Sequence, residues 1–350
     1  MIRLAQLYTG GVGSEIVRRC AGHPEFELVA VLVHSDDKAG QDSGTLVGGT
    51  PNGIVTTRSI DDVLAARPDA AIHSGLTWDV DLITRFLRAG VNLYTGIGGY
   101  YLPGSPEFDV VDRAARDGSA SFTAGGNIPG LISDVFPLFV TGYTGRIRQI
   151  RARQRNDVST YPSGVQIQSL GIGKDVGADP ELAVMIDVGF TAAIRQSANM
   201  VADGLGIKCT DCVLAEKRTV LADEDLTLPA SGLLVAKGTV AGVEWTWAAR
   251  AGDQVFLQVT NQQTAALGLG PGWRETHEEP PWRVEIDGEP PVIATFGWPP
   301  GAPPGESTSL LNVSRAMNTI PRLVAARPGC VSVLDFPVVV PADGLAVDGP

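Results

Sequence analysis

The sequence lacks the features of a membrane protein or a nucleic-acid-binding protein. No apolar run approaches the roughly 18 residues that a membrane-spanning helix needs, and no basic segment followed by an apolar core opens the chain. We therefore expect a cytoplasmic protein with no membrane partner. Acidic side chains number 39 against 27 basic ones, which gives a formal net charge of -12. Because this charge repels phosphate backbones, nucleic acid is not an expected partner either.

Cysteine and histidine are scarce, which argues against a disulfide framework, a metal centre and a hydrolytic triad. The 350 residues contain four cysteines and four histidines, scattered along the chain. Cys209 and Cys212 have CxxC spacing, but a zinc site needs a second ligand pair that the sequence does not offer. A redox pair would precede a helix, whereas a strand-like stretch follows these two. We predict two ordinary cysteines and no metal site, and no Ser/His/Asp order is evident.

The first 135 residues alternate short apolar runs with amphipathic stretches. This order predicts a parallel sheet with helices on both faces. The expected strands are Arg3 to Tyr8, Phe26 to Val33, Gly53 to Thr57, Ala70 to His73, Val91 to Tyr94 and Ser119 to Thr123. Ser59 and Ser105 are expected to cap helices at their N-termini, and Gly90 and Gly118 to end them.

The pattern changes beyond about residue 140, where long stretches alternate apolar and polar side chains and predict an antiparallel sheet. One long helix is expected from Pro180 to Gly204, with Asp179 as its N-cap. Residues 269–305 are rich in proline, glycine and tryptophan, and their tail, GWPPGAPPGES, is expected to be a crossing segment. A final helix should then start at Ser307 or Thr308 and end at Pro328-Gly329. We predict a dinucleotide-binding domain, 1–135 with the returning segment 306–350, and a substrate-binding and dimerisation domain, 136–305.

A glycine-rich loop opens the chain. LAQLYTGGVGSEIV, residues 4–17, has the strand, turn and helix order of a dinucleotide-binding loop, although a plain turn is the alternative. Gly10 would permit the tight turn and Gly13 would let the backbone approach a pyrophosphate, while Ile16 stands where a third glycine belongs. The predicted cofactor contacts here, around the positive end of the helix, are Thr9, Gly10, Gly11, Val12 and Gly13.

Further cofactor contacts are expected where later strands end. After the second strand, VLVHSDDKAG offers Ser35 and Lys38 where an NAD-specific site carries an acid. Lys38 could neutralise a 2'-phosphate that Ser35 hydrogen-bonds, or the turn could simply face water, so NADP is favoured and NAD is possible. HSGLT and TGIGG follow the fourth and fifth strands. Their glycines and hydroxyl groups either contact the cofactor or only form tight turns. The predicted contacts there are Ser74, Gly75, Thr95 and Gly96.

Four segments carry a family resemblance. TAGGNIPGLISDVFPLF, residues 123–139, is followed by RNDVSTYPSG and LGIGK, and the chain later contains NTIPRLVAARPG, residues 318–329. Together they resemble the dihydrodipicolinate reductase-like oxidoreductases, and most closely the branch of 2,4-diaminopentanoate dehydrogenase and the native amine dehydrogenases. The resemblance implies an α/β fold, in which a Rossmann-type doubly wound parallel sheet joins a second α+β domain built on an open, mainly antiparallel sheet that forms a homodimer. It also implies cofactor contacts at Asn127 and Asn318.

The sequence departs from this branch at one position that matters for chemistry. The amine dehydrogenases carry a glutamate after the fifth strand, which assists addition of ammonia and loss of water. Here the segment reads YTGIGGYYLPG, with Gly98 and Gly99 at the nearest positions. Reductive amination with free ammonia would then need another acid, such as Glu107 or Asp134.

Hydride transfer does not need that glutamate. A preformed iminium requires only a positioned nicotinamide, whereas a ketone also requires a proton donor, for which Tyr100, Tyr101 and Tyr161 are candidates. Each of these rings could instead be an aromatic pocket wall. We predict an NAD(P)-dependent oxidoreductase acting on a C=N or C=O group of a small, mostly apolar carbonyl, imine or amine substrate. The alternatives are an amine dehydrogenase that uses a different acid and a non-catalytic NADP(H)-binding sensor.

Overall fold

The computed structural model describes residues 1–299 and 304–343, which form two compact units. Unit 1 comprises Met1–Asn127 and Ser309–Pro350, and unit 2 comprises Ile128–Thr308. The sequence-based division fell at residues 135 and 305. Residues 300–303 of the expected crossing segment and 344–350 of the returning segment lie outside the described residues.

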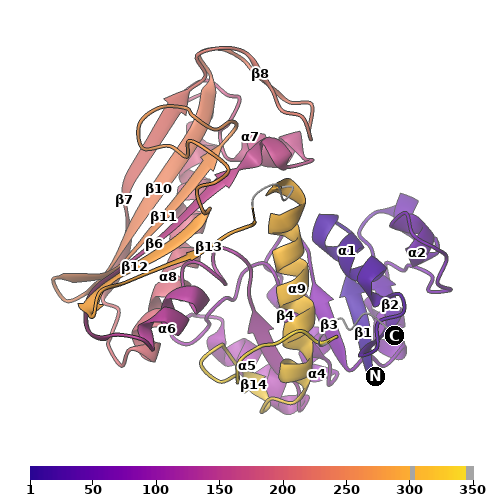
Figure 1. Cartoon of the computed structure of the whole chain (residues 1–350). Coiled ribbons are helices and arrows are strands. Elements are labelled where there is room, and N and C mark those ends of the chain that lie inside the picture. Colours follow the sequence, from indigo (N-terminus) through magenta and orange to yellow (C-terminus); the bar gives the residue numbers. More distant parts are fainter. Residues whose placement is uncertain (300–303, 344–350) are drawn as a thin grey trace, which may run out of the picture. The chain divides into compact units, whose positions relative to one another are not determined.

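Unit 1 is a Rossmann-type doubly wound domain built on a six-stranded parallel sheet (Figure 1). The strand order is β14-β5-β4-β3-β1-β2. The strands are β1 Ile2–Leu7, β2 Phe26–Leu32, β3 Ala70–His73, β4 Asn92–Thr95, β5 Ser121–Ala124 and β14 Gly329–Cys330. The helices are α1 Gly11–Cys20, α2 Ser43–Leu46, α3 Ile60–Ala65, α4 Val80–Arg88, α5 Phe108–Asp117 and α9 Pro304–Val324, with a 3-10 turn at Asp36–Lys38.

Both faces of this sheet are buried because alternate strand residues pack against helices on opposite sides. Leu4 and Ile72 pack with α1 and α9 on one face. Leu7 and Ala71 pack with α3, α4 and α5 on the other. Full burial of a leucine-sized side chain contributes about 1.5–3 kcal/mol, so both layers stabilise unit 1. The predicted parallel sheet with helices on both faces is confirmed.

Local signals placed several helix ends correctly. Ser59 caps α3, because its hydroxyl accepts the Asp62 N–H at 3.1 Å. Gly118 is the C-terminal cap of α5. Ser105 is not a helix cap, however: it lies in a separate turn, and α5 begins only at Phe108.

Two other predictions for unit 1 are wrong. Residues 53–57 form only isolated bridges rather than a strand, because they hydrogen-bond back to the loop around Gln41 and Asp42. The final helix ends at Val324, before the predicted proline. The Gly329 N–H bonds to the Ala120 carbonyl at the edge of β5, and this adds the short strand β14 to the sheet.

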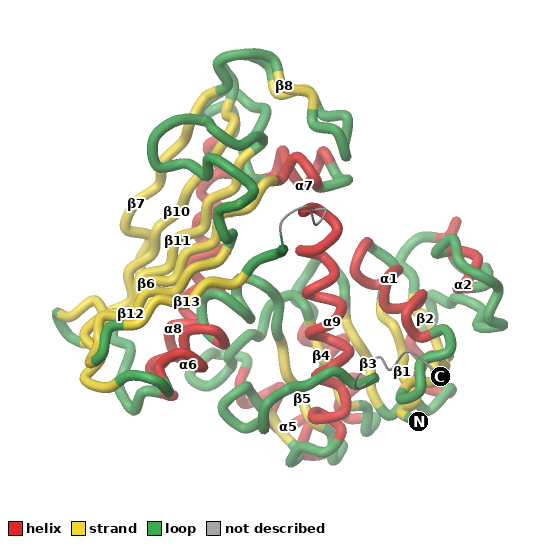
Figure 2. The backbone as a smooth tube through the Cα atoms, viewed as in Figure 1, coloured by secondary structure: helices red, strands yellow, loops and turns green. Residues whose placement is uncertain are grey.

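Unit 2 is an α+β domain built on a six-stranded sheet in the order β13-β12-β6-β11-β10-β7 (Figure 2). Only the β6–β11 pair is parallel, so the sheet is mainly antiparallel, as predicted. The strands are β6 Gly145–Asp157, β7 Asp211–Leu221, β10 Val240–Ala251, β11 Gln254–Thr264, β12 Trp282–Glu289 and β13 Val292–Phe296, with a separate pair, β8 Leu226–Thr227 and β9 Leu234–Val235. The helices are α6 Val135–Thr141, α7 Gly164–Ser169 and α8 Pro180–Gly204, with a 3-10 turn at Val158–Thr160.

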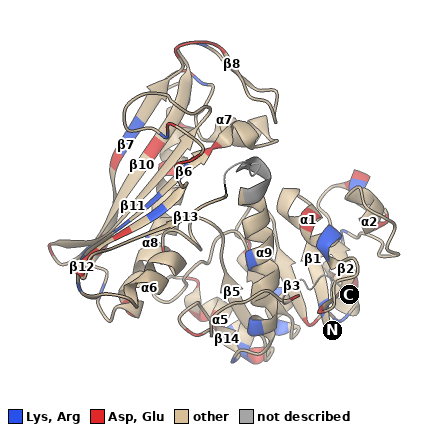
Figure 3. Ribbon diagram, in the orientation of Figure 1, with Lys and Arg blue, Asp and Glu red and all other residues tan. Residues whose placement is uncertain are grey.

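The long helix α8 lies on this sheet through aromatic contacts. Asp179 caps it by accepting the Leu182 N–H at 3.0 Å, as expected. Phe190 of α8 packs edge-on against Trp245 and Trp247 of β10. Arg148 forms an ion pair with Asp287, and Arg218 forms one with Glu244, each across neighbouring strands of the sheet. Figure 3 marks basic and acidic residues along the strands of this sheet. Among the described residues, none of the helices combines the length and apolar character needed to span a bilayer.

Candidate functional site

The strands of unit 1 end in register at one edge of the sheet. Leu7 is paired with His73, His73 with Thr95, and Thr95 with Ala124. The loops that follow these residues therefore emerge side by side at the carboxyl edge, where ligands bind in open α/β sheets. Most of the predicted cofactor contacts lie in these loops.

The N-terminus of α1 has open space for a ligand. Gly10 is the N-cap of the helix, and a Cβ on Gly10 or Gly11 would meet no atom within 4 Å. The first amide groups of a helix have no partner within the helix and point outward with the positive end of the helix dipole. Gly10, Gly11 and the adjacent Thr9 and Val12 therefore lie where an anion such as a pyrophosphate would be stabilised.

Gly13 has a packing role that the sequence analysis did not predict. A Cβ at Gly13 would lie 2.1 Å from the Tyr8 carbonyl oxygen and 2.7 Å from Gln6 Nε2. The helix can approach β1 this closely only because Gly13 has no side chain. Tyr8 itself has a φ of +73°, the conformation that favours glycine. These contacts align Tyr8-x-Gly10-x-x-Gly13 with the G-x-G-x-x-G motif. Tyr8 then stands in place of the first glycine, and Ile16 lies beyond the motif.

Gln6 links the loops after β1 and β3, and sequence reasoning missed it. Its side chain is fully buried, and Nε2 donates to the Tyr8 carbonyl at 2.9 Å and to Ser74 Oγ at 3.2 Å. The Oε1 atom has no partner among the described residues. A glutamine in the middle of the apolar run LAQLY was the available signal.

Two basic side chains lie near the end of β2. Lys38 closes the 3-10 turn that follows this strand. Arg58 forms an ion pair with Asp36 of the same turn. Sequence reasoning missed Arg58 because the isolated bridge between Leu32 and Thr57 brings it there from a later loop.

Ser35 is already engaged in this turn. A hydrogen bond from Ser35 is the main cause that lowers the pKa of Asp37, an exposed carboxyl group. The serine hydroxyl would have to exchange this partner to bind a phosphate. The geometry of the turn therefore favours Lys38 and Arg58 over Ser35 as anion contacts.

A cavity of about 110 Å³ lies at the carboxyl edge beside β3. It is lined by Val12, Ile72, His73, Ser74, Gly75, Tyr94, Gly96, Gly125, Asn312 and Ala316. His73 is buried, and burial lowers its pKa to about 4. Its Nδ1 lies 3.0 Å from Thr95 Oγ1, so Thr95 contacts the histidine rather than the cavity. Asn312 was not predicted, since α9 contributes it from near the C-terminus.

The two asparagines that the resemblance implied do not line this cavity. Asn127 follows β5 and is the last residue of the first segment of unit 1. Asn318 lies on α9, where its Oδ1 accepts the Ala342 N–H at 3.0 Å. This bond ties the chain beyond α9 to the helix.

The three candidate tyrosines belong to different units. Tyr100 and Tyr101 line a cavity of about 260 Å³ that also includes residues of α5 and of the segment after β14. The Tyr100 hydroxyl donates to the Gly96 carbonyl at 3.2 Å. Tyr161 is in unit 2, where its hydroxyl accepts from Asn156 Nδ2 at 3.2 Å, and burial raises its pKa to about 12. Tyr161 is therefore neutral near pH 7 and is a weaker acid than free tyrosine.

Trp78 explains the glycines that stand nearest to the family glutamate. Gly98 and Gly99 have φ values of +70° and +62°. A Cβ at Gly98 would lie 2.8 Å from Trp78 Cβ, and one at Gly99 would lie 2.5 Å from Trp78 Cη2. The indole therefore fills the space above this turn. A side chain such as glutamate cannot be accommodated there without displacing it.

Asp134 is a structural residue. It is fully buried and is the N-cap of α6. Its Oδ2 accepts the Gly130 N–H at 3.0 Å and the Ser197 hydroxyl at 2.7 Å. These bonds engage the side chain at the start of α6, so Asp134 would have to exchange partners to replace the missing acid. Glu107, the other suggested residue, immediately precedes α5 and does not cap it through its side chain.

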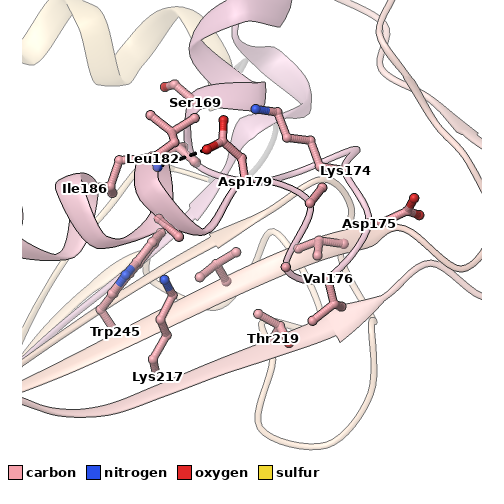
Figure 4. Close-up of a pocket in the computed structure, with 17 residues that line it drawn as sticks. Ser169, Lys174, Asp175, Val176, Asp179, Leu182, Ile186, Lys217, Thr219 and Trp245 are labelled. Carbon is pink, nitrogen blue, oxygen red and sulfur yellow. Dashed lines mark hydrogen bonds between the residues drawn. The ribbon is translucent and has the colours of Figure 1, made fainter.

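Unit 2 contains a largely apolar cavity of about 180 Å³ beneath the start of α8 (Figure 4). Leu182 and Ile186 of α8 and Trp245 of β10 contribute to its wall. Lys217 also lines it, but its ammonium group pairs with Asp187 at 2.9 Å. The cavity can therefore accept the hydrocarbon part of a small molecule.

Comparison with known proteins agrees with the fold and the predicted resemblance. The family model of the 2,4-diaminopentanoate dehydrogenase C-terminal domain matches residues 131–346. An amine dehydrogenase from Streptomyces virginiae is 29% identical over 350 residues, which cover 94% of this chain and 94% of the relative. A 2,4-diaminopentanoate dehydrogenase from Acetoanaerobium sticklandii is 23% identical over 338 residues, 93% of this chain and 87% of the relative. The structure of an amine dehydrogenase from Mycobacterium smegmatis superposes with a TM-score of 0.79 at 22% identity and covers 98% of each chain.

Proposed function

We propose, from the premise that this chain belongs to the 2,4-diaminopentanoate dehydrogenase C-terminal domain family, that it transfers a hydride to a C=N or C=O group of a small, mostly apolar molecule. The family match covers more than half of the chain, and the curated relatives are dehydrogenases. The chain is therefore an NAD(P)-dependent oxidoreductase. The sensor alternative is not retained.

The open N-terminus of α1 is the observation that carries the cofactor assignment. Gly10 and Gly11 leave space that a Cβ would occupy, beside amide groups suited to a pyrophosphate. When bound, the nicotinamide supplies or accepts the hydride. We propose that the chain holds it through Thr9, Gly10, Gly11, Val12, Ser74, Gly75 and Gly96, with Thr95 acting through His73. The cofactor contacts at Asn127 and Asn318 that the resemblance implies stay predictions.

NADP is the proposed form of the cofactor, with NAD as the alternative. Lys38 and Arg58 lie near the end of β2, where the 2'-substituent of the adenosine ribose is bound in this fold. Two cations favour a phosphate there, and the exposed carboxylates of Asp36 and Asp37 oppose it.

Proton delivery distinguishes the proposed substrates. Near neutral pH Tyr161 keeps its proton, so it can donate a hydrogen bond to a carbonyl oxygen that gains negative charge during reduction. Tyr101 and Tyr100 are the alternatives for this role. A preformed iminium already carries its proton and needs orientation alone. The apolar cavity of unit 2 supports a mostly apolar substrate.

Amine dehydrogenation is the second candidate, because two relatives are named for reactions of amines. Building an iminium from ammonia requires an acid and a base at the carbonyl carbon. The turn at Gly98 and Gly99 has no room for the glutamate, which favours preformed imines and ketones over ammonia-dependent amination.

The proposal is tested by following oxidation of NADPH and NADH with a preformed cyclic imine, with a ketone, and with the ketone plus ammonium. We expect turnover of the imine and the ketone to exceed ammonium-dependent turnover. Tyr161→Phe or Tyr101→Phe should lower ketone reduction by about 10²-fold and spare imine reduction, because only the ketone needs the hydroxyl proton. The exposed Tyr143→Phe is the matched control and should behave as the unmodified chain.

Two results would contradict this assignment. Efficient ammonium-dependent turnover would show that the chain has an acid other than the family glutamate and would favour the second candidate. Equal losses for imine and ketone in both tyrosine variants would show that the hydroxyl group is not a proton donor.

We also propose that the second domain forms a homodimer. The helix α8 supports this, because Val184, Met185 and Val188 expose roughly two thirds of their surface near its start. A helix that is apolar on more than one side is usually buried on more than one side.

A further inference from the structure

The cavity beside β3 contains polar groups but no formal charge in its lining. No aspartate, glutamate, lysine or arginine contributes to its wall, and its one titratable side chain near neutrality, His73, is buried. Its volume of about 110 Å³ has space for roughly three or four water-sized groups. The cavity therefore favours a small uncharged polar group over a phosphate.

The bonds of Thr95 favour one tautomer of His73. The hydroxyl of Thr95 has one proton, which it donates to the Ile97 carbonyl at 3.0 Å, while the same oxygen accepts the Ile97 N–H at 3.1 Å. His73 Nδ1 lies 3.0 Å from this oxygen, and the tautomer in which Nδ1 donates to it is the one that satisfies all three bonds at once. The imidazole is neutral near pH 7 because burial lowers its pKa to about 4. Its Nε2 therefore presents a lone pair as an acceptor.

Asn312 supplies a second acceptor to the same cavity. Its Oδ1 is buried and has no hydrogen-bond partner among the described residues. Such an oxygen is unfavourable in a folded protein unless a donor reaches it. Ser74, also in the lining, accepts from Gln6 Nε2, and its own hydroxyl proton is thus available for donation.

We infer that this cavity binds the primary carboxamide of the nicotinamide cofactor, with Asn312 Oδ1 and His73 Nε2 accepting its two N–H groups. A primary carboxamide is uncharged, has two donors on one nitrogen, and offers one acceptor oxygen for the Ser74 hydroxyl. Its three heavy atoms match the space available. The inference rests on the proposed function, because it requires a nicotinamide ligand.

The experiment combines a change in the ligand with a change in the protein. The acetylpyridine analogue of the cofactor has a methyl group in place of the carboxamide nitrogen and lacks both donors. Titration calorimetry would measure Kd for the natural oxidised cofactor and for this analogue, in both the NADP and the NAD series. We expect the unmodified chain to prefer the carboxamide by about tenfold or more, and Asn312→Leu or Asn312→Ala to lose most of that preference.

Controls separate this result from a general loss of binding. Ser314→Ala lies on the same helix, outside the cavity, and should keep the full preference. ADP-ribose, which has the terminal ribose but no nicotinamide, should bind the unmodified chain and the Asn312 variants equally. These titrations also show that each variant is folded.

The outcomes distinguish the inference from the proposed function. If the Asn312 variants keep the preference for the carboxamide, or weaken ADP-ribose as much as the whole cofactor, the cavity does not bind the carboxamide and the inference is overturned, while cofactor binding stands. If the unmodified chain binds none of these ligands, the proposed function is overturned as well.

Discussion

At the residue scale, the proposed preference for NADP depends on Lys38 and Arg58, whose contacts within the protein are weak. Arg58 pairs with Asp36, whose side chain is largely exposed, and such pairs contribute at most about 1 kcal/mol to stability. A phosphate dianion can replace Asp36 as the partner of Arg58 at little loss, because it forms stronger charge-assisted bonds. Lys38 forms no ion pair within the described part of the chain.

Lys38→Ala should weaken NADP binding by about 1–2 kcal/mol and leave NAD binding nearly unchanged, because only NADP carries the 2'-phosphate. Arg58→Ala should do the same, with a smaller effect at high salt, where exposed charges are screened. Titration of both cofactors measures this directly, with the exposed Lys237→Ala as a control. Equal losses for NADP and NAD would mean that neither cation meets the 2'-phosphate.

At the scale of elements, the junction of β1 and α1 depends on the absence of one side chain. The Tyr8 carbonyl occupies the position that a Cβ of Gly13 would need, at 2.1 Å. Gly11, only two residues earlier and also helical, has open space around it. Gly13 therefore allows α1 to pack closely against β1, whereas Gly11 leaves open space at the N-terminus of the helix.

Gly13→Ala should lower the free energy of unfolding by about 1–3 kcal/mol, because the added methyl group forces α1 away from β1. Gly11→Ala should leave it unchanged or raise it by about 0.5–1 kcal/mol, since alanine favours the helix and meets no atom there. Denaturant titration of both variants provides the measurement. Destabilisation of the same size in both would contradict the distinction.

Elements with strong local signals were predicted well, and those held by distant contacts were not. β3 was predicted with its observed bounds, Ala70–His73, from a short apolar run before a glycine turn. The expected strand at 53–57 had a similar appearance, but its backbone bonds to a neighbouring loop instead. Ser105 has the right chemistry for a cap, yet the chain completes another turn before α5 begins.

At the scale of the whole molecule, the exposed apolar side chains of α8 raise the question of assembly. Val184, Met185 and Val188 lie near one end of a 25-residue helix whose other side packs on the sheet of unit 2. Burial of these three side chains against a second copy would remove apolar surface from water and stabilise a dimer.

Met185→Glu should weaken self-association at least about tenfold, because it places an unpaired carboxylate in an apolar interface. Sedimentation equilibrium over a range of concentrations measures the change. Lys208→Glu, which also introduces a negative charge but at another exposed position, is the control. A monomeric unmodified chain at micromolar concentration would contradict the homodimer, and an unchanged dimer in Met185→Glu would exclude α8 from the interface.

The sequence by itself determined the features that depend on neighbouring residues. Strand and helix alternation, the change of pattern near residue 140 and the caps at Ser59 and Asp179 all follow from periodicity and backbone chemistry over a few residues. The same local information located the glycine loop and the loops after the strands. It did not predict the packing role of Gly13, because the sequence does not show which glycine faces another backbone.

Only the tertiary structure decided which side chains meet at the carboxyl edge. Asn312 reaches the cavity beside His73 through the packing of α9 on the sheet, and Arg58 reaches the turn after β2 through a single bridge. Trp78 covers the turn at Gly98 because two loops emerge side by side from paired strands. Contacts of this kind depend on strand order and register, which no local pattern of residues encodes.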